Sequence, residues 1–443
     1  MTRTPFLKSL NHYFTIPLAT LLLTGCSLFV DKDDIPLEGE RISILELQKS
    51  LEPDDAALQV EGLITPSEWR NEYWPQRGGY PNHSMQNLAL SGDQLTKAWS
   101  ADIGKGTTKR LPLNASPIVV DGTIYTLDAE AKLSAFTAET GKKLWSADMT
   151  HLKEEDPVIT GGIAYSGGAL YITNGYNELL AVNPKDGAIY WRRELPAPSR
   201  AAPTVIDGRA FVTTLDNKLL AIDAKNGAIL WEYLGINESA GIIGAASPAA
   251  SRDVVIPVFS SGEITALRVA NGSIAWTDSL SGLRSLGGLT TISDIKALPV
   301  MDKGLVIAIS FSGRIVAIDE RTGTRVWQRE IGGSQTPWMA GNHLFVLSSE
   351  NQLIALGRDN GTIRWVTDLP KTNDDDPIVM TGPVLAGGRL IIAANNGYIY
   401  ELSPETGALT NEWKTGKTIT TPPIVAGGTL YLLDEDGTLS AYR

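Results

Sequence analysis

One eleven-residue phrase recurs along the chain, and each copy ends in a tryptophan. "AIDAKNGAILW" occupies 221–231, and related copies end at Trp145, Trp191, Trp276, Trp327, Trp365 and Trp413. A four-stranded unit that repeats every 40–50 residues or so is typical of β-propellers, in which each repeat forms one blade. The repeat therefore predicts one ring-shaped domain, although a chain of 443 residues could otherwise hold two or three domains.

A single repeat, 202–231, contains the signals of four short strands. Its sequence, "APTVIDGRAFVTTLDNKLLAIDAKNGAILW", alternates β-branched or apolar runs with turns at Asp207-Gly208, Asp216-Asn217 and Asn226-Gly227. Such turn residues tolerate the positive φ angles of tight hairpins. The pattern predicts an all-β fold of four-stranded antiparallel blades. We interpret the periodic tryptophans as wedges between neighbouring blades, rather than as a surface that stacks sugars or bases.

The two ends of the repeat region complement each other. Residues 422–443 supply three strands without a closing tryptophan, whereas 95–104 form a lone strand that contains Trp99. Pairing the two would remove exposed edges and close the ring. Seven complete units plus this composite predict eight blades. Seven blades are the alternative, if the weak unit at 247–276 or at 382–413 does not form.

The N-terminus has the pattern of an export signal. A positively charged start precedes the short apolar run "FTIPLATLLL" (14–23), which "LTGC" (23–26) follows. This resembles a bacterial lipobox, so 1–25 would be a signal peptide and Cys26 would carry the lipids; an ordinary signal with a chance cysteine is the alternative. Ser27 resembles an outer-membrane sorting residue. We expect 26–70 to be a tether with little fixed structure and 71–443 to be the propeller.

Composition excludes several classes of function. The net charge of −12 argues against a nucleic-acid partner. The chain has one cysteine and four histidines, so a disulfide framework is impossible and a Cys/His zinc site is not expected. Motifs of the G-x-S-x-G or H-E-x-x-H kind do not occur. We therefore expect no catalytic, cofactor-binding or metal-binding residues.

The phrase A-x-D-x-x-T/N-G-x-x-x-W resembles the repeat of pyrroloquinoline-quinone (PQQ) enzymes, and "WPQRGGYPNHS" (74–84) resembles the opening segment of such repeats. With the lipobox and "GCSLF" (25–29), the chain is similar to the BamB-type lipoproteins of the β-barrel assembly machinery. That resemblance implies an eight-bladed propeller without cofactor, anchored at the periplasmic face of the outer membrane. It further implies a scaffold that binds the POTRA domains of BamA and assists the folding and insertion of outer-membrane proteins. Unfolded outer-membrane proteins are the further partners that this resemblance suggests.

Two other functions stay open at this point. A quinoprotein-like enzyme or sensor would bind PQQ or another small ligand in the channel of the propeller. Such enzymes usually need a Ca²⁺ site and often a disulfide between adjacent cysteines, which this chain cannot form. Binding of an extracytoplasmic polysaccharide is the third possibility.

The longest irregular stretches predict where a partner binds. They connect one blade to the next and should share one face of the ring with the second turn of each blade; they are 192–202, 232–247, 277–297 and 366–381. Two of them resemble BamB segments that contact BamA, and they place Arg200 and Asp294 on the matching charged positions. The leucines that the family has before the arginine are replaced here by proline and alanine. The alternative is that both charges are solvated or paired locally.

Overall fold

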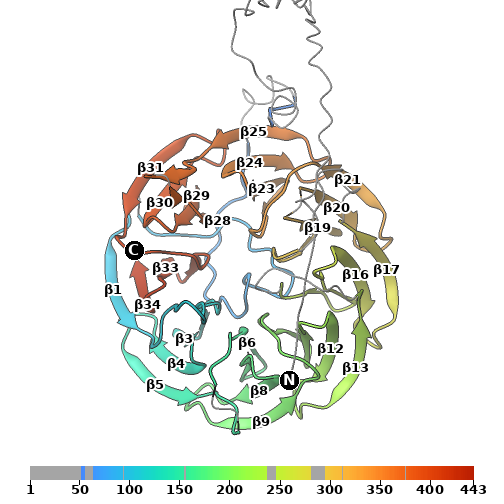
Figure 1. The fold of residues 1–443 in the computed structure, drawn as a ribbon. Coiled ribbons are helices and arrows are strands. Elements are labelled where there is room, and N and C mark those ends of the chain that lie inside the picture. Colours follow the sequence, from blue (N-terminus) through green and yellow to red (C-terminus); the bar gives the residue numbers. More distant parts are fainter. Residues whose placement is uncertain are drawn as a thin grey trace, which may run out of the picture. The chain divides into compact units, whose positions relative to one another are not determined.

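We describe the protein from a computed structural model, which places residues 51–54, 63–92, 94–153, 156–236, 246–280, 295–311, 313–374 and 376–443. These residues form 34 β-strands. Among them, no helix is long and apolar enough to cross a membrane. Eight four-stranded sheets are arranged in a ring (Figure 1).

The first four blades follow the repeat in chain order. Blade 1 comprises β2 (Ile118–Val120), β3 (Thr123–Leu127), β4 (Lys132–Thr137) and β5 (Lys143–Asp148). Blade 2 comprises β6 (Gly162–Ser166), β7 (Ala169–Thr173), β8 (Glu178–Val182) and β9 (Ile189–Glu194). Blade 3 comprises β10 (Thr204–Ile206), β11 (Arg209–Thr213), β12 (Lys218–Asp223) and β13 (Ile229–Leu234). Blade 4 comprises β14 (Ala249–Ala250), β15 (Val254–Ile256), β16 (Glu263–Arg268) and β17 (Ile274–Ser279).

The second half of the ring continues in the same way. Blade 5 comprises β18 (Val300–Asp302), β19 (Leu305–Ile309), β20 (Ile315–Asp319) and β21 (Arg325–Arg329). Blade 6 comprises β22 (Trp338–Ala340), β23 (His343–Leu347), β24 (Gln352–Gly357) and β25 (Ile363–Asp368). A hairpin of β26 (Thr372–Asn373) and β27 (Asp376–Pro377) precedes blade 7, which comprises β28 (Met380–Ala386), β29 (Arg389–Ala394), β30 (Tyr398–Leu402) and β31 (Leu409–Lys414). Blade 8 comprises β32 (Ile424–Ala426), β33 (Thr429–Leu433), β34 (Thr438–Tyr442) and β1 (Lys97–Asp102).

The ring closes as the sequence predicts. Strand β1 pairs antiparallel with β34, from Lys97 opposite Tyr442 to Asp102 opposite Thr438. The two weak units also form complete sheets, blades 4 and 7. The prediction of eight blades is therefore confirmed, and the seven-bladed alternative is wrong.

Burial and turn geometry explain why each repeat folds into a blade. The second and third strands are almost wholly buried, as in β8, whereas the outermost strand alternates between exposed and half-buried positions, as in β5. In the first turn of blade 3, Asp207 and Gly208 have φ angles of 46° and 74°. Both central residues of a type I′ hairpin need positive φ, which this dipeptide tolerates.

The repeat tryptophans lie between blades, as predicted. The indole Nε1 of Trp145 donates to Pro184 O at 3.1 Å, and that of Trp231 donates to Val269 O at 3.1 Å, both in the third turn of the next blade. The indole ring also covers the glycine of that turn, because a Cβ on Gly187 would lie 2.8 Å from the Trp145 side chain. At seven of the eight seams, one blade is thus coupled to the next by a tryptophan and the glycine of a third turn. At the seam between blades 7 and 8, Trp413 packs against Tyr442 instead.

Residues 71–88, which we call the central segment, join all eight blades. This segment runs through the middle of the ring in Figure 1. It bonds the first strand of every blade in turn, through the pairs Trp74–Val119, Pro75–Tyr165, Gln76–Val205, Pro81–Ala250, Asn82–Met301, Gln86–Trp338, Leu88–Leu385 and Asn71–Val425. Innermost strands that would otherwise face the channel unpaired are therefore capped by one stretch of chain.

The described part of the expected tether also contacts the propeller. Leu63 is only 5% exposed and belongs to the largest apolar cluster. Residues 51–54, which we call the strap, lie against blades 5 and 6. From its composition, this segment was expected to have little fixed structure. Its described parts are held on the propeller because a few apolar and acidic side chains suffice to bind a short segment to a preformed surface. Residues 1–50, including Cys26, lie outside the described residues.

Candidate partner-binding face

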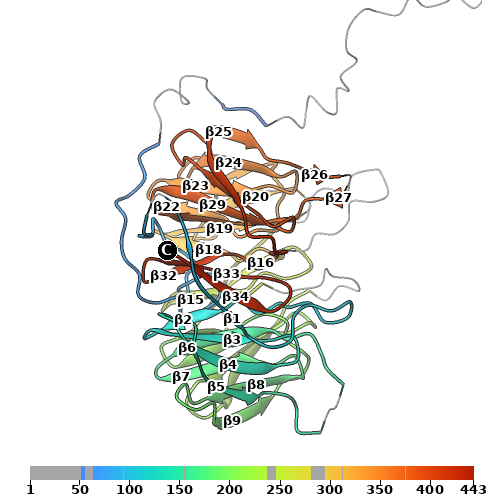
Figure 2. The ribbon, with the colours of Figure 1, turned by 90° about the vertical axis from the view of Figure 1, so that its left-hand side faces the viewer.

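The two faces of the ring differ in the kind of loop they carry. Because the four strands of a blade alternate in direction, the second turns and the blade-to-blade connections share one face, which we call the loop face. The first and third turns share the other, the turn face. Figure 2 shows the β26–β27 hairpin projecting beyond the body of the ring; it belongs to the connection between blades 6 and 7, on the loop face.

Arg200 lies on the loop face, in the connection between β9 and β10. Its backbone is held by neighbours on both sides: the Asn114 side chain donates to Arg200 O at 2.8 Å and to Thr160 O at 2.9 Å. The hydroxyl of the adjacent Ser199 donates to Thr213 O at 2.7 Å. Side chains and strands of three blades therefore fix this connection in place.

The Arg200 guanidinium, in contrast, is not engaged. The residue is half-buried, and no hydrogen bond or ion pair joins its side chain to any other residue that the structure describes. The idea that Arg200 is paired locally finds no support there. Asp294, the second predicted contact residue, lies outside the described residues. The structure thus places Arg200 on a held stretch of backbone, with no partner for its side chain among the described residues.

Exposed apolar side chains accompany Arg200 on the loop face. They sit in second turns and blade connections, and they are Leu152 (83% exposed), Leu215 (41%), Ile236 (64%), Phe311 (44%) and Val379 (53%). Sequence reasoning missed them, although a large apolar residue within an otherwise polar turn is a signal that could have found them. These residues are spread over several blades of the loop face. Exposed apolar and arginine side chains on one face are compatible with a protein–protein interface.

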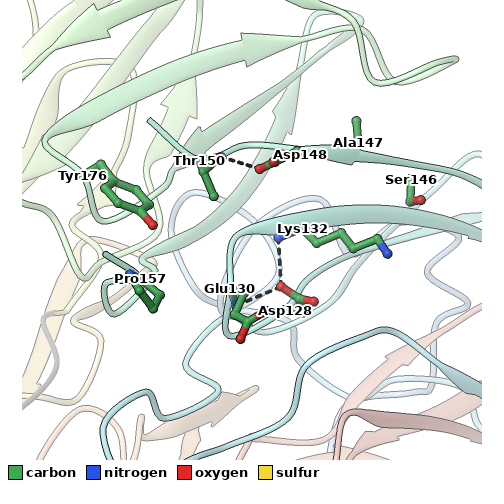
Figure 3. A pocket seen from close by; sticks show the side chains of 9 residues that line it. All are labelled: Asp128, Glu130, Lys132, Ser146, Ala147, Asp148, Thr150, Pro157 and Tyr176. Atoms are coloured by element: carbon green, nitrogen blue, oxygen red, sulfur yellow. Dashed lines mark hydrogen bonds between the residues drawn. The ribbon is translucent and has the colours of Figure 1, made fainter. Parts of the chain in front are cut away.

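A groove opens on the same face between blades 1 and 2, with a volume of about 580 Å³ (Figure 3). Asp128, Glu130 and Asp148 line it beside Tyr176. The Asp128 carboxylate accepts backbone N–H groups of Glu130 and Lys132 at 2.9 and 2.8 Å, and Asp148 accepts that of Thr150. The carboxylates of Asp128 and Asp148 thus stabilise turns at the edge of this groove.

A quinone and its metal ion would bind in the channel if the chain were a quinoprotein-like enzyme. Among the described residues, no three His, Cys, Asp or Glu side chains lie close enough to hold a metal ion. Trp74 and Trp338 stack with an offset, with ring centroids 6.4 Å apart and an interplanar angle of 22°. His83 lies buried there, with Nδ1 2.7 Å from Pro299 O, and burial lowers its pKa to about 4. It is therefore neutral at physiological pH.

Comparisons with known proteins agree with this reading of the fold. The family model described as "Outer membrane protein assembly factor BamB" matches residues 129–367 and 371–443. A shorter match, to the β-propeller domain of glucose, ethanol and alcohol dehydrogenases, covers 89–167. The outer membrane protein assembly factor BamB of Salmonella typhimurium is 29% identical over 430 residues, 96% of either chain. That of Escherichia coli is 30% identical over 350 residues, 78% of this chain and 88% of the relative.

Solved structures show the same architecture. BamB from Moraxella catarrhalis superposes with a TM-score of 0.67 at 21% identity and covers 79% of this chain and all of that one. The quinohemoprotein alcohol dehydrogenase of Comamonas testosteroni reaches 0.64 at 13% identity, over 87% of this chain and 83% of its own. At such identities these likenesses show the fold alone. Because the BamB family model spans most of the chain, this protein belongs to the BamB family of outer membrane protein assembly factors.

Proposed function

We propose that this protein is a non-enzymatic scaffold in the assembly of outer-membrane β-barrels, and that its loop face binds the POTRA domains of BamA. Membership of the BamB family supports the role in assembly. The proposal extends to a lipid anchor at Cys26, a place at the periplasmic face of the outer membrane, and help to client proteins as they fold and insert.

The single observation that carries the docking surface is Arg200. Its backbone is fixed by Asn114 while its guanidinium has no partner among the described residues, and exposed apolar residues share its face. Fixing the backbone of a binding loop before association lowers the conformational entropy lost on binding. An arginine of this kind is a common hot spot, whose loss costs about 2 kcal/mol or more of binding free energy.

Charge reversal tests the surface. We expect Arg200→Glu, and separately Asp294→Lys, to reduce the amount of BamA that co-purifies from detergent-solubilised outer membrane, with unchanged melting temperatures. The matched control is Lys142→Glu with Lys185→Glu, two exposed lysines in third turns on the turn face. The docking surface is misplaced if the lysine variant loses BamA while the Arg200 and Asp294 variants keep it.

The anchor is tested by fractionation. Cys26→Ala removes the thiol that would carry the lipids, so we expect a folded protein that moves from the outer-membrane pellet to the soluble periplasmic fraction. Stable anchoring requires more than one acyl chain, which only a lipidated N-terminus would supply here. A variant that still sediments with the outer membrane would contradict the lipobox prediction.

A further inference from the structure

The strap shows how a short extended segment binds at the seam between two blades. On the outer edge of blade 6, Asp54 N donates to Ile363 O at 3.2 Å, and Ile363 N donates to the Asp54 carboxylate at 2.8 Å. The same carboxylate accepts from Arg329 Nη2 of blade 5 at 2.6 Å. Leu51, three residues earlier, packs against the apolar cluster that contains Ile363 and Trp327.

Two features of the blades create this site. The first is an arginine two residues after the repeat tryptophan: Arg329 Nε donates to Gly361 O of the next blade at 2.8 Å, which directs its remaining N–H groups outward. The second is an open backbone edge. Thr362 O accepts from Gly357 N inside the blade, so the N–H and C=O of the following residue, Ile363, face outward.

The seam between blades 2 and 3 repeats the first feature. Arg193 lies two residues after Trp191, and its Nε donates to Gly227 O of the next blade. No other bond or ion pair engages the Arg193 guanidinium within the described residues. The same position on the other outer strands is held by Ala101, Ala147, Tyr233, Asp278, Thr367 and Thr415. An arginine at this position thus occurs at two of the eight seams, and at one of them it already binds an aspartate.

The backbone of blade 3 repeats the second feature. Ala228 O accepts from Asp223 N at 2.8 Å, as Thr362 O does in blade 6. The strand registers also match, with Ile222 opposite Ile229 and Leu356 opposite Ile363, each next to a bulge. The N–H and C=O of Ile229 therefore face outward as those of Ile363 do.

The two seams differ in how exposed the apolar side chains of their outer strands are. Ile363 is 5% exposed beneath the strap, whereas Ile229 is 44% exposed and its neighbour Leu230 45%. Beside the uncovered seam, on the turn face, lies a groove of about 450 Å³ that Trp191 and Lys225 help to line, whereas Arg193, Ile229 and Leu230 are outside its lining. The uncovered seam combines an outward arginine, a nearby lysine, apolar side chains and an open strand edge, which together suit an acidic extended peptide.

We propose that the seam between blades 2 and 3 is a docking site for an extended peptide of a partner protein, with an apolar residue three positions before an aspartate. The aspartate would bind Arg193 and Ile229 N, and the apolar side chain would cover Ile229 and Leu230. The site lies on the rim of the ring, away from the loop face, so it goes beyond the proposed binding of BamA and does not depend on it.

A peptide with the strap's own sequence is the direct probe. Fluorescent KSLEPDDA, which copies residues 49–56, is titrated into the full-length lipoprotein in detergent, with anisotropy as the readout. We expect saturable binding to one site. Charged hydrogen bonds contribute about 1.5–3 kcal/mol, so Arg193→Gln should weaken binding roughly ten-fold or more. Replacing the aspartate of the peptide that corresponds to Asp54 by asparagine should have the same effect while leaving the protein unaltered.

Four results would overturn the proposal. The first is no saturable binding. The second is binding that Arg193→Gln and the asparagine peptide leave unchanged, or binding that Lys142→Gln weakens equally; Lys142 lies in the third turn of blade 1, outside the proposed site. The third is binding lost in Arg329→Gln but kept in Arg193→Gln, which would mean that the peptide merely exchanges with the strap. Sedimentation showing a dimer that the peptide dissociates would assign the seam to a second copy of this chain instead.

Discussion

The glycine in each third turn is constrained by more than its own backbone. Gly272 has φ of 72°, which disfavours any side chain, and a Cβ there would also lie 2.6 Å from the Trp231 ring of the preceding blade. Gly208, in a first turn, has nearly the same φ of 74° but nothing within 4 Å of its Cβ position. The two glycines therefore separate the cost of backbone strain from the cost of displacing the neighbouring tryptophan.

This difference predicts unequal effects of alanine. Gly208→Ala should cost only the left-handed conformation, about 1–2 kcal/mol. Gly272→Ala should cost that plus roughly 1–3 kcal/mol for overpacking against Trp231. Chemical denaturation of the two variants measures the difference. Equal losses of unfolding free energy would show that the tryptophan moves aside freely and does not couple the blades.

The surroundings of single side chains are the feature that the sequence predicts least well. It could place Arg200 in a connection on the loop face, because the alternation of strands fixes which loops share a face. It could not show that the backbone at Arg200 is held by Asn114, since the two residues lie 86 positions apart along the chain. Cys26 and Asp294 lie outside the described residues, so their roles stay predictions.

At the scale of elements, β1 is the strand on which ring closure depends. It brings Trp99 to the outer edge of blade 8, where the indole Nε1 donates to Ala138 O of blade 1 at 3.2 Å and the ring covers Gly141. Without β1, the outer edge of β34 would have no hydrogen-bond partner, and blade 8 would lose the tryptophan that packs against blade 1. One strand thus completes a blade and joins the two ends of the ring.

Replacing Lys97–Asp102 by six Gly/Ser residues keeps the chain length but removes this strand. We expect a loss of more than about 3 kcal/mol, the usual cost of removing a packed tryptophan, together with a lower melting temperature. Replacing 31–36 by the same linker is the control and should leave melting unchanged. Identical melting curves for both variants would refute closure through β1.

The repeat allowed the strands to be predicted well, because period-two patterning and turn residues recur in each copy. Boundaries were less certain. The connection expected from 192 begins only after β9 ends at Glu194, since an outer strand continues as long as its inner neighbour offers partners. The β26–β27 hairpin was not foreseen, and its two-residue strands contain no alternation that could have indicated it.

For the whole molecule, the number of blades could be read from the sequence, but the central segment could not be located. Its bonds join residues 71–88 to strands spread from blade 1 to blade 8, and most involve backbone atoms that leave no mark in the pattern of side chains. The consequence is a ring held together in three ways: by the tryptophan of each seam, by β1 at the closure, and by one segment that touches every blade. Such a ring should unfold as a unit, because loosening one blade also loosens the segment that the others share.

Gln76 offers a test of that cooperativity. Its buried side chain accepts from Val205 N and donates to Val205 O, each at 2.8 Å, so it satisfies both polar groups of an innermost strand. Gln76→Ala leaves these groups unpaired, at a cost of about 1–3 kcal/mol for each. Gln352→Ala, which removes an exposed hydrogen bond to Asp368, is the control and should change stability by no more than about 0.5 kcal/mol. If the central segment unites the ring, hydrogen exchange of Gln76→Ala will accelerate in the innermost strands of all eight blades; acceleration confined to blade 3 would show that the blades open independently.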